Sequence, residues 1–114
     1  MTLPFPDSFL WGTASNFGKI ETASAHNFQG LRAEDGHILE RTTNHEKQRL
    51  ADVDHIQRFG TSYRCSIDWA RLQAKPYAAF ANGVVQAYRD FFEALNNRGI
   101  KITLVLHHTC HPSW

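Results

Sequence analysis

The last eleven residues of the chain, LVLHHTCHPSW, run from an apolar segment into side chains that can carry chemistry. Imidazole can donate a hydrogen bond from one nitrogen and accept one at the other, which suits a hydroxyl group of a ligand. In an extended strand His108 and Cys110 share one face, whereas His107 and His111 share the other. Two ligands on one face are fewer than a zinc site uses, so we predict no bound metal. A bend at Pro112 that brings His111 across is the alternative that keeps a metal site.

Strands and helices are predicted to alternate along the chain and to position these side chains. The apolar or alternating segments FLWGTA, TSYRCSIDW and IKITLVL are typical of strands. Asn44 can cap a helix through HEKQRLADVDHIQRF that ends at Gly60, and Asn82 can cap a second helix that ends at Gly99. An apolar stripe marks the second helix and consists of Val84, Tyr88, Phe91 and Leu95. The order strand, helix, strand, helix, strand predicts an α/β fold with parallel strands joined by right-handed crossovers.

Polar side chains gather at the predicted carboxyl ends of the strands, which is where chemistry lies in parallel α/β folds. The segment 15–43 has little helical or strand pattern, and we predict that it forms a functional rim. Alternation in the second strand places Arg64 on one face and Tyr63 and Cys65 on the other. Trp69 lies at the end of the same segment.

Composition excludes several classes of protein. The chain has 114 residues, of which 42% are hydrophobic and 20% charged, as in a soluble globular domain. A formal net charge of +1 gives no electrostatic reason to bind nucleic acid or an anionic membrane, and neither partner is expected. The start MTLPFPDSFLWG has no signal-peptide pattern, so a cytoplasmic location is expected. Two cysteines, Cys65 and Cys110, are too few for a disulfide framework and are expected to be reduced thiols.

Three motifs resemble those of glycoside hydrolase family 1. They are FPDSFLWGTASNFGKIETA, SYRCSIDWARL and GIKITLVLHHTCHP, which occur in the family's order and together span nearly the whole chain. The resemblance implies a (β/α)8 TIM barrel, of which residues 1–114 form the first three βα units, with no second domain. It also implies a retaining β-glycosidase whose two catalytic glutamates lie beyond the fourth and seventh strands. Neither glutamate falls within this chain, so the chain resembles an N-terminal fragment without catalytic residues.

The resemblance assigns roles to individual residues. Arg64 matches the arginine that hydrogen-bonds the nucleophilic carboxylate, and His108 matches the histidine that hydrogen-bonds sugar hydroxyls. Lys19 occupies the position at which the family usually has a glutamine that hydrogen-bonds sugar hydroxyls. Unlike glutamine, lysine can only donate hydrogen bonds and cannot accept them. Trp69 is a further candidate for substrate binding, and His107 is expected to pack away from the site. The expected ligand is a β-glycoside or another carbohydrate.

The sequence favours neither cofactor-dependent chemistry nor a catalytic pair of acids within this chain. No cofactor is expected, because the chain lacks a Gly-rich phosphate loop, a nucleophile elbow and the cysteine spacing of a zinc module. Glu21 and Asp68 are the acids near strand ends that could face each other, and hydrogen bonding within the rim is favoured over a catalytic pair. A glycosidase pair must lie about 5 Å apart in retaining enzymes and about 6.5 to 9.5 Å apart in inverting enzymes.

Two functional hypotheses remain open. The first is the N-terminal part of a β-glycosidase that is inactive as an isolated chain. The second is a non-catalytic module that binds a sugar or completes a barrel with another chain. Three strands leave open sheet edges, and Ile102, Leu104 and Leu106 are expected on an uncovered interior face, so self-association is also predicted.

Overall fold

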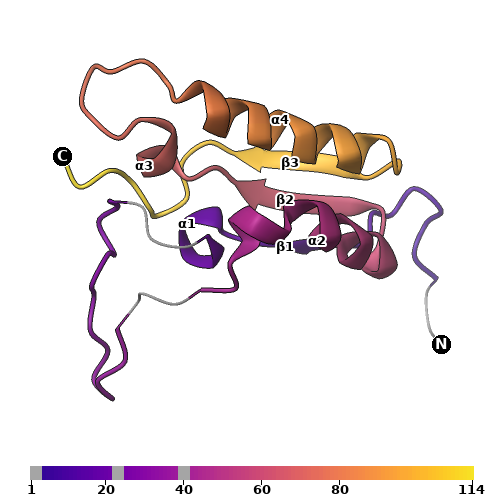
Figure 1. Cartoon of the computed structure of the whole chain (residues 1–114). Coiled ribbons are helices and arrows are strands. Elements are labelled where there is room, and N and C mark those ends of the chain that lie inside the picture. Colours follow the sequence, from indigo (N-terminus) through magenta and orange to yellow (C-terminus); the bar gives the residue numbers. More distant parts are fainter. Residues whose placement is uncertain (1–3, 22–24, 39–41) are drawn as a thin grey trace.

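The computed structural model describes residues 4–21, 25–38 and 42–114 and is drawn in Figure 1. Its elements are β1 (Gly12–Ala14), α1 (Phe17–Ile20), α2 (His45–Phe59), β2 (Ser62–Ser66), α3 (Trp69–Leu72), α4 (Asn82–Asn96) and β3 (Lys101–Val105). The strands form one parallel sheet in the order β1-β2-β3. The predicted α/β fold is confirmed, and the architecture is that of a partial α/β barrel.

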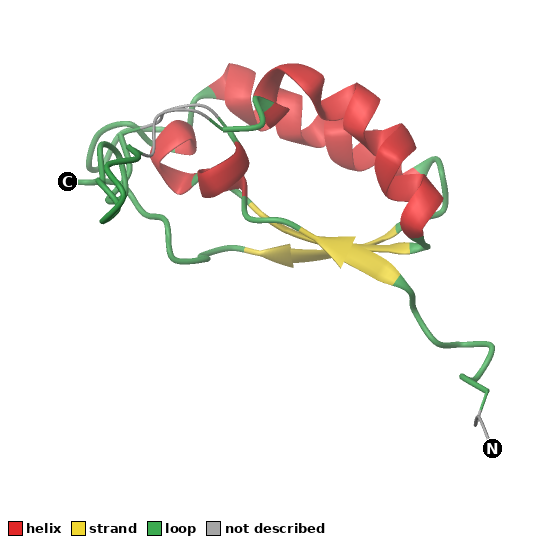
Figure 2. Cartoon of the chain, turned by 90° about the horizontal axis from the view of Figure 1, so that it is seen from below, coloured by secondary structure: helices red, strands yellow, loops and turns green. Residues whose placement is uncertain are grey.

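Within the described residues, helices cover one face of the sheet and leave the other face uncovered (Figure 2). Helices α2 and α4 lie together on the same side of the sheet, as Figure 2 shows. The strands run toward the end of the molecule where α1, α3 and the C-terminus lie, whereas the N-terminus lies at the other end (Figure 1). None of the helices in the described ranges combines the length and the apolar character that crossing a bilayer requires.

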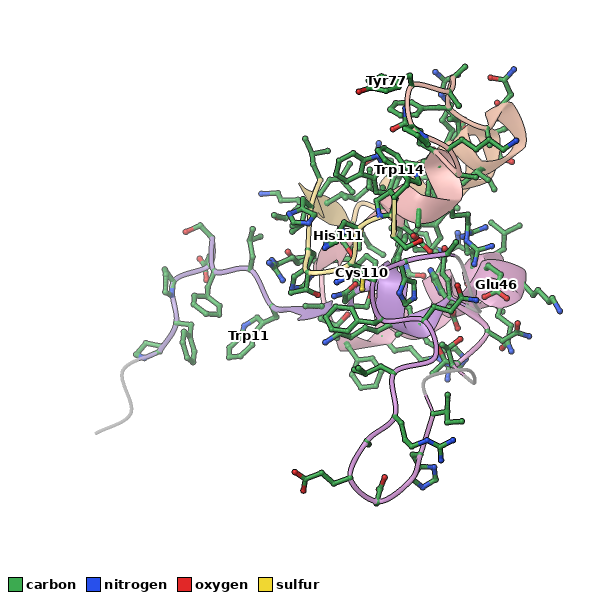
Figure 3. All side chains as sticks on the ribbon, turned by 90° about the vertical axis from the view of Figure 1, so that its left-hand side faces the viewer. Trp11, Glu46, Tyr77, Cys110, His111 and Trp114 are labelled. Carbon is green, nitrogen blue, oxygen red and sulfur yellow. The ribbon has the colours of Figure 1, made fainter. Side chains whose placement is uncertain are left out.

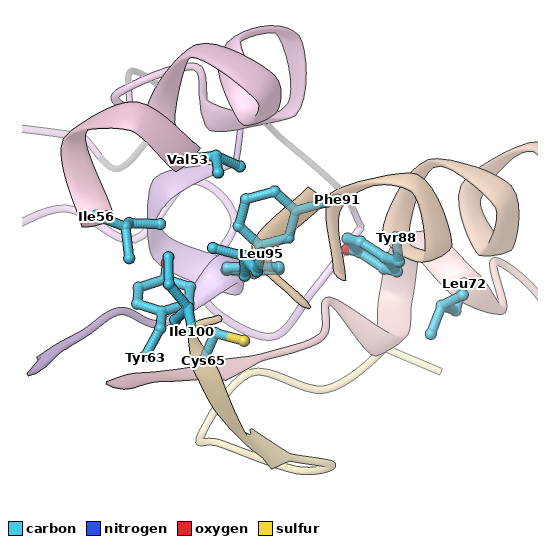
Figure 4. Close-up of a cluster of buried hydrophobic side chains, with 10 residues drawn as sticks. Val53, Ile56, Tyr63, Cys65, Leu72, Tyr88, Phe91, Leu95 and Ile100 are labelled. Carbon is cyan, nitrogen blue, oxygen red and sulfur yellow. The ribbon is translucent and has the colours of Figure 1, made fainter. Parts of the chain in front are cut away.

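The core lies between the sheet and the two long helices (Figure 4). Helix α4 contributes the predicted stripe, with Tyr88, Phe91 and Leu95 buried and Val84 packed at its margin. The other buried apolar members are Phe17, Val53, Ile56, Tyr63, Cys65, Leu72 and Ile100. Because the helical period of 3.6 residues places such positions on one face, the sequence pattern was sufficient to identify this helix and its orientation.

Short elements differ from the sequence prediction. Strand β1 begins at Gly12, and the rings of Phe9 and Trp11 before it pack against each other with a centroid separation of 4.8 Å. The segment predicted to be irregular contains the single turn α1, in which Phe17 is fully buried. The second strand ends before Trp69, because Asp68 caps α3 by accepting from the backbone N–H of Arg71.

The helix boundaries were predicted well, but the capping side chains were not. Helix α4 begins at Asn82 itself, and Ala81 occupies the cap position. Asn44 occupies the cap position of α2, yet it adopts a left-handed conformation with φ of 60° and makes no side-chain capping hydrogen bond. Packing of the apolar faces therefore determines where these helices start, rather than local capping.

The expected facing of β3 is wrong for Ile102 and Leu104. These residues pair in register with Tyr63 and Cys65, whose side chains are buried under the helices. Paired residues of parallel strands point to the same face, so Ile102 and Leu104 also point toward the helices. Leu104 is still 41% exposed and Leu106 is 69% exposed, because among the described residues β3 pairs only with β2 and its other edge is open.

Candidate functional site

The loops that follow the three strands are joined at one edge of the sheet by the amide of Asn16. Its Nδ2 donates to the backbone oxygen of His108 at 2.9 Å and to Oγ1 of Thr109 at 3.2 Å. Its Oδ1 accepts from the hydroxyl of Ser66 at 3.3 Å, and that hydroxyl accepts from the backbone N–H of Phe17 at 3.0 Å. One side chain thus ties the ends of β1, β2 and β3 together.

The turn that carries His108 has an unusual backbone. Cys110 N–H donates to the carbonyl of His108 at 2.8 Å, and Thr109 between them has a φ of 65°. A positive φ is unfavourable for a β-branched residue, so the surroundings must hold this conformation. Asn16 does so from one side, and Asn27 donates to the carbonyl of Thr109 at 3.2 Å from the other.

The segment 25–38 is anchored to the same turn. Asn27 and His111 exchange two hydrogen bonds of 2.9 Å, one from each backbone N–H. Ser113 N–H also donates to the carbonyl of Ala25 at 3.0 Å. The loop beyond these contacts projects away from the sheet (Figure 1). Part of the predicted rim therefore lies against the candidate site, and sequence pattern gave no signal for these asparagine contacts.

His108 presents one imidazole nitrogen without a protein partner. The side chain is half-buried, and its Nδ1 is inaccessible and has no hydrogen-bond partner among the described residues. A buried polar atom of this kind is costly unless a ligand or water satisfies it. Arg64 is exposed on the face opposite Tyr63 and Cys65, as strand alternation predicted. It forms no ion pair in the part of the chain that the structure describes.

Lys19 lies on α1, close to Cys110 in the segment that follows β3. Gly18 beside it packs so tightly on Cys110 that an added Cβ would overlap the cysteine side chain. Lys19 is exposed, and its Nζ lies 5.8 Å from the centre of the Phe28 ring, which is cation–π distance. Burial raises the pKa of the Cys110 thiol, and the charge of Lys19 acts against this rise. The ammonium group is therefore near the turn that carries His108.

Trp69 belongs to a different cluster from His108. Its ring packs edge-on against His107 at 6.3 Å and Trp114 at 6.1 Å, and its indole N–H donates to Gln73 at 3.0 Å. Figure 3 views this end of the molecule and labels Trp114 and His111. A cavity of about 400 Å³ adjoins the cluster and is lined by Ile67, Trp69, Leu72, Phe80, Leu106 and His107.

Glu21 and Asp68 are buried structural acids. Each is 1% exposed. Glu21 forms ion pairs with Arg49 and with Arg71, the latter at 3.1 Å, and accepts from the hydroxyl of Tyr88 at 2.9 Å. Burial, and secondarily the charge of Glu21, raises the pKa of Tyr88. These contacts fit the expectation of hydrogen bonding within the rim, since both acids are occupied by protein groups rather than facing an open cleft.

Several contributors to the site were missed by sequence reasoning. Asn16, Asn27 and Phe28 lie in the segment that had no regular pattern, and Arg49 lies on the predicted helix that ends at Gly60, where no role was assigned to it. Within the described residues, no three histidine, cysteine or acidic side chains come together as a metal site. Cys65 and Cys110 are both free and buried.

Parallel strands with polar side chains at their carboxyl ends define part of a barrel with its candidate site at the strand ends. The sequence profile of glycosyl hydrolase family 1 matches residues 1–113, and the chain belongs to this family.

Individual relatives agree with this assignment. A 6-phospho-beta-galactosidase of Staphylococcus epidermidis is 27% identical over 120 residues, which cover 98% of this chain and 26% of that protein. Beta-glucosidase 30 of Arabidopsis thaliana is 29% identical, with 95% of this chain and 21% of that protein covered. The solved structure of a β-glycosidase from Pyrococcus horikoshii superposes with a TM-score of 0.83 and 29% identity over 100% of this chain and 28% of that chain. The chain thus spans about a quarter of the length of its relatives.

Proposed function

We propose that this chain forms the N-terminal part of a retaining β-glycosidase and supplies one side of its sugar site. The observation that carries the proposal is the joined edge of the sheet, where Asn16 fixes the turn of His108 and where the imidazole Nδ1 of His108 has no hydrogen-bond partner among the described residues. Lys19 and Arg64 are exposed from the neighbouring segments. An imidazole that can both donate and accept suits a sugar hydroxyl.

The isolated chain is proposed to be catalytically inactive. Glu21 and Asp68 are held by arginines and by a helix N-terminus, so neither is placed to attack a glycosidic bond or to protonate it. Retaining hydrolysis requires two carboxyl groups on either side of the scissile bond. By the family resemblance, these groups belong to the fourth and seventh strands.

Hydrolysis of a panel of chromogenic β-glycosides tests this function. The 114-residue chain is expected to release no chromophore above a protein-free blank, and the longest reading frame that contains it is expected to be active. In that longer protein, His108→Ala should lower kcat/KM by about tenfold to a hundredfold, whereas His107→Ala should have a much smaller effect. Release by the short chain that disappears on Glu21→Gln would contradict the proposal.

A barrel-completing module is the second candidate, and the open edge of β3 favours it. Leu106 is 69% exposed and lines the apolar cavity beside this edge, which a further βα unit could fill. The test mixes this chain with the part of the Pyrococcus horikoshii β-glycosidase that lies beyond the matched 28%. Leu106→Glu should abolish a complex seen by size-exclusion chromatography, whereas Leu50→Glu on the outer helix α2 should not. Leu50 is a matched control, because it is 63% exposed.

A further inference from the structure

Two exposed histidines lie close together beyond the end of β3. The ring centroids of His107 and His111 are 6.1 Å apart, and the ring planes are tilted by 42°. Both residues are exposed. In a continuous strand, residues four positions apart would be separated by about 13 Å, at roughly 3.3 Å per residue. The chain therefore folds back between the two histidines.

A strained turn at Thr109 brings the two rings together. The N–H of Cys110 donates to the carbonyl of His108 at 2.8 Å, two residues back, and the φ of Thr109 is 65°. A γ-turn with a positive φ is rare and strained, and it persists only where neighbouring segments hold it. The chain thus reverses at Thr109, ahead of the bend expected at Pro112.

His111 is held with one ring nitrogen available. Its backbone makes two hydrogen bonds of 2.9 Å to Asn27. Its Nδ1 lies 2.9 Å from the carbonyl oxygen of Pro112, which can only accept, so Nδ1 carries the proton. The Nε2 of the neutral ring then has a free lone pair. A metal-binding histidine almost always donates its other ring N–H to a carbonyl or carboxylate in this way.

The separation of the two rings fits a single metal ion between them. Metal–nitrogen bonds of about 2.0 to 2.1 Å place the centroids of two imidazoles on one ion about 4.5 to 6.5 Å apart, depending on the ligand angle. The observed 6.1 Å lies in this range. We propose that His107 and His111 bind one divalent transition-metal ion, with Cu²⁺ bound most tightly, because imidazole suits these metals and Cu²⁺ leads their general order of affinity.

The proposed metal site is open rather than closed. Within the described ranges no group of three histidine, cysteine or acidic side chains comes together, so two imidazoles are the protein ligands and water fills the other positions. Structural zinc sites use four protein ligands, and the fold of this chain therefore does not depend on the ion. Neither histidine belongs to the proposed sugar site, so this inference stands independently of it.

Titration of the 114-residue protein with Cu²⁺, Ni²⁺ and Zn²⁺ tests the proposal. The ring of Trp69 lies 6.3 Å from that of His107, so bound Cu²⁺ should quench tryptophan fluorescence to saturation at one ion per chain. The same ion should broaden the amide NMR signals of residues 107–111 first. His107→Ala and His111→Ala should each weaken Cu²⁺ binding by at least about tenfold. The matched control is His55→Ala, which removes an exposed histidine from the outer helix α2 and should leave the affinity unchanged.

The variants separate a defined site from scattered binding to surface histidines. His111→Ala keeps the backbone hydrogen bonds to Asn27, so the circular dichroism of the protein should not change. Quenching that does not saturate, or an affinity that survives either His107→Ala or His111→Ala, would overturn the proposal. An equal loss of affinity in His55→Ala would overturn it as well. Tighter binding of Ni²⁺ or Zn²⁺ than of Cu²⁺ would overturn the assignment of the preferred metal.

Discussion

Replacing Glu21 with glutamine isolates the contribution of one buried negative charge. The carboxylate is fully buried and lies between Arg49 and Arg71, whose side chains are 10% and 23% exposed. Glutamine keeps the size and one oxygen acceptor, so the hydroxyl of Tyr88 retains a partner. What is lost is the charge that neutralises two guanidinium groups in a poorly solvated place.

The exposed pair of Asp54 and Arg98 provides a matched control. It has the same chemistry at 2.7 Å, but its side chains are 61% and 34% exposed. Removing one partner of a buried pair costs about 3 to 5 kcal/mol, whereas an exposed pair contributes about 0 to 1 kcal/mol. Partial exposure of Arg71 places the expected cost of Glu21→Gln near the lower limit, at about 3 kcal/mol, and that of Asp54→Asn below about 1 kcal/mol.

Urea unfolding followed by tryptophan fluorescence measures both changes. A small domain loses about 1 to 3 kcal/mol of stability per molar urea, so Glu21→Gln should lower the midpoint by about 1 to 3 M and Asp54→Asn by much less. Domains of this size are stable by only about 5 to 15 kcal/mol, so the first change removes a large fraction of the total. Equal shifts for the two variants would show that the buried network does not depend on the charge of Glu21.

Three further predictions concern packing, pH and association. Gly18→Ala should destabilise the fold by about 1 to 3 kcal/mol, because the new methyl group overlaps Cys110, whereas Gly83→Ala, with open space around it, should not destabilise it in the same melts. Burial raises the pKa of Cys65 from 9.0 to about 12, so between these values the unfolded chain loses a proton that the folded chain keeps. The free energy of unfolding should therefore fall as pH rises through this range, and a slope unchanged in Cys65→Ala would contradict this. The isolated chain should self-associate in size-exclusion chromatography with light scattering, and Leu106→Glu should weaken this association; a sharp monomer at all concentrations would refute it.

Local sequence patterns predicted some features of this fold, whereas features that depend on contacts between distant segments left no such pattern. The helices at 45–59 and 82–96 and the facing of Arg64 were predictable, because each follows from a repeat of 3.6 or 2 residues within one segment. Ile102 was placed on the wrong face. Its apolar neighbours Leu104 and Leu106 fit either face of the strand, and only the register with Tyr63 decides between the faces.

The sequence by itself determined the order of the elements, the parallel sheet, the family and the gathering of polar residues at one edge of the sheet. The tertiary structure alone decided which of these residues touch. Asn16 reaches His108 across 92 positions, and Glu21 reaches Tyr88 across 67. Neither contact leaves a local pattern, because a hydrogen bond between distant segments depends on how strands align and helices dock rather than on the residues nearby in the chain. The same holds for Lys19, whose type was visible in the sequence but whose position close to Phe28 and Cys110 was not.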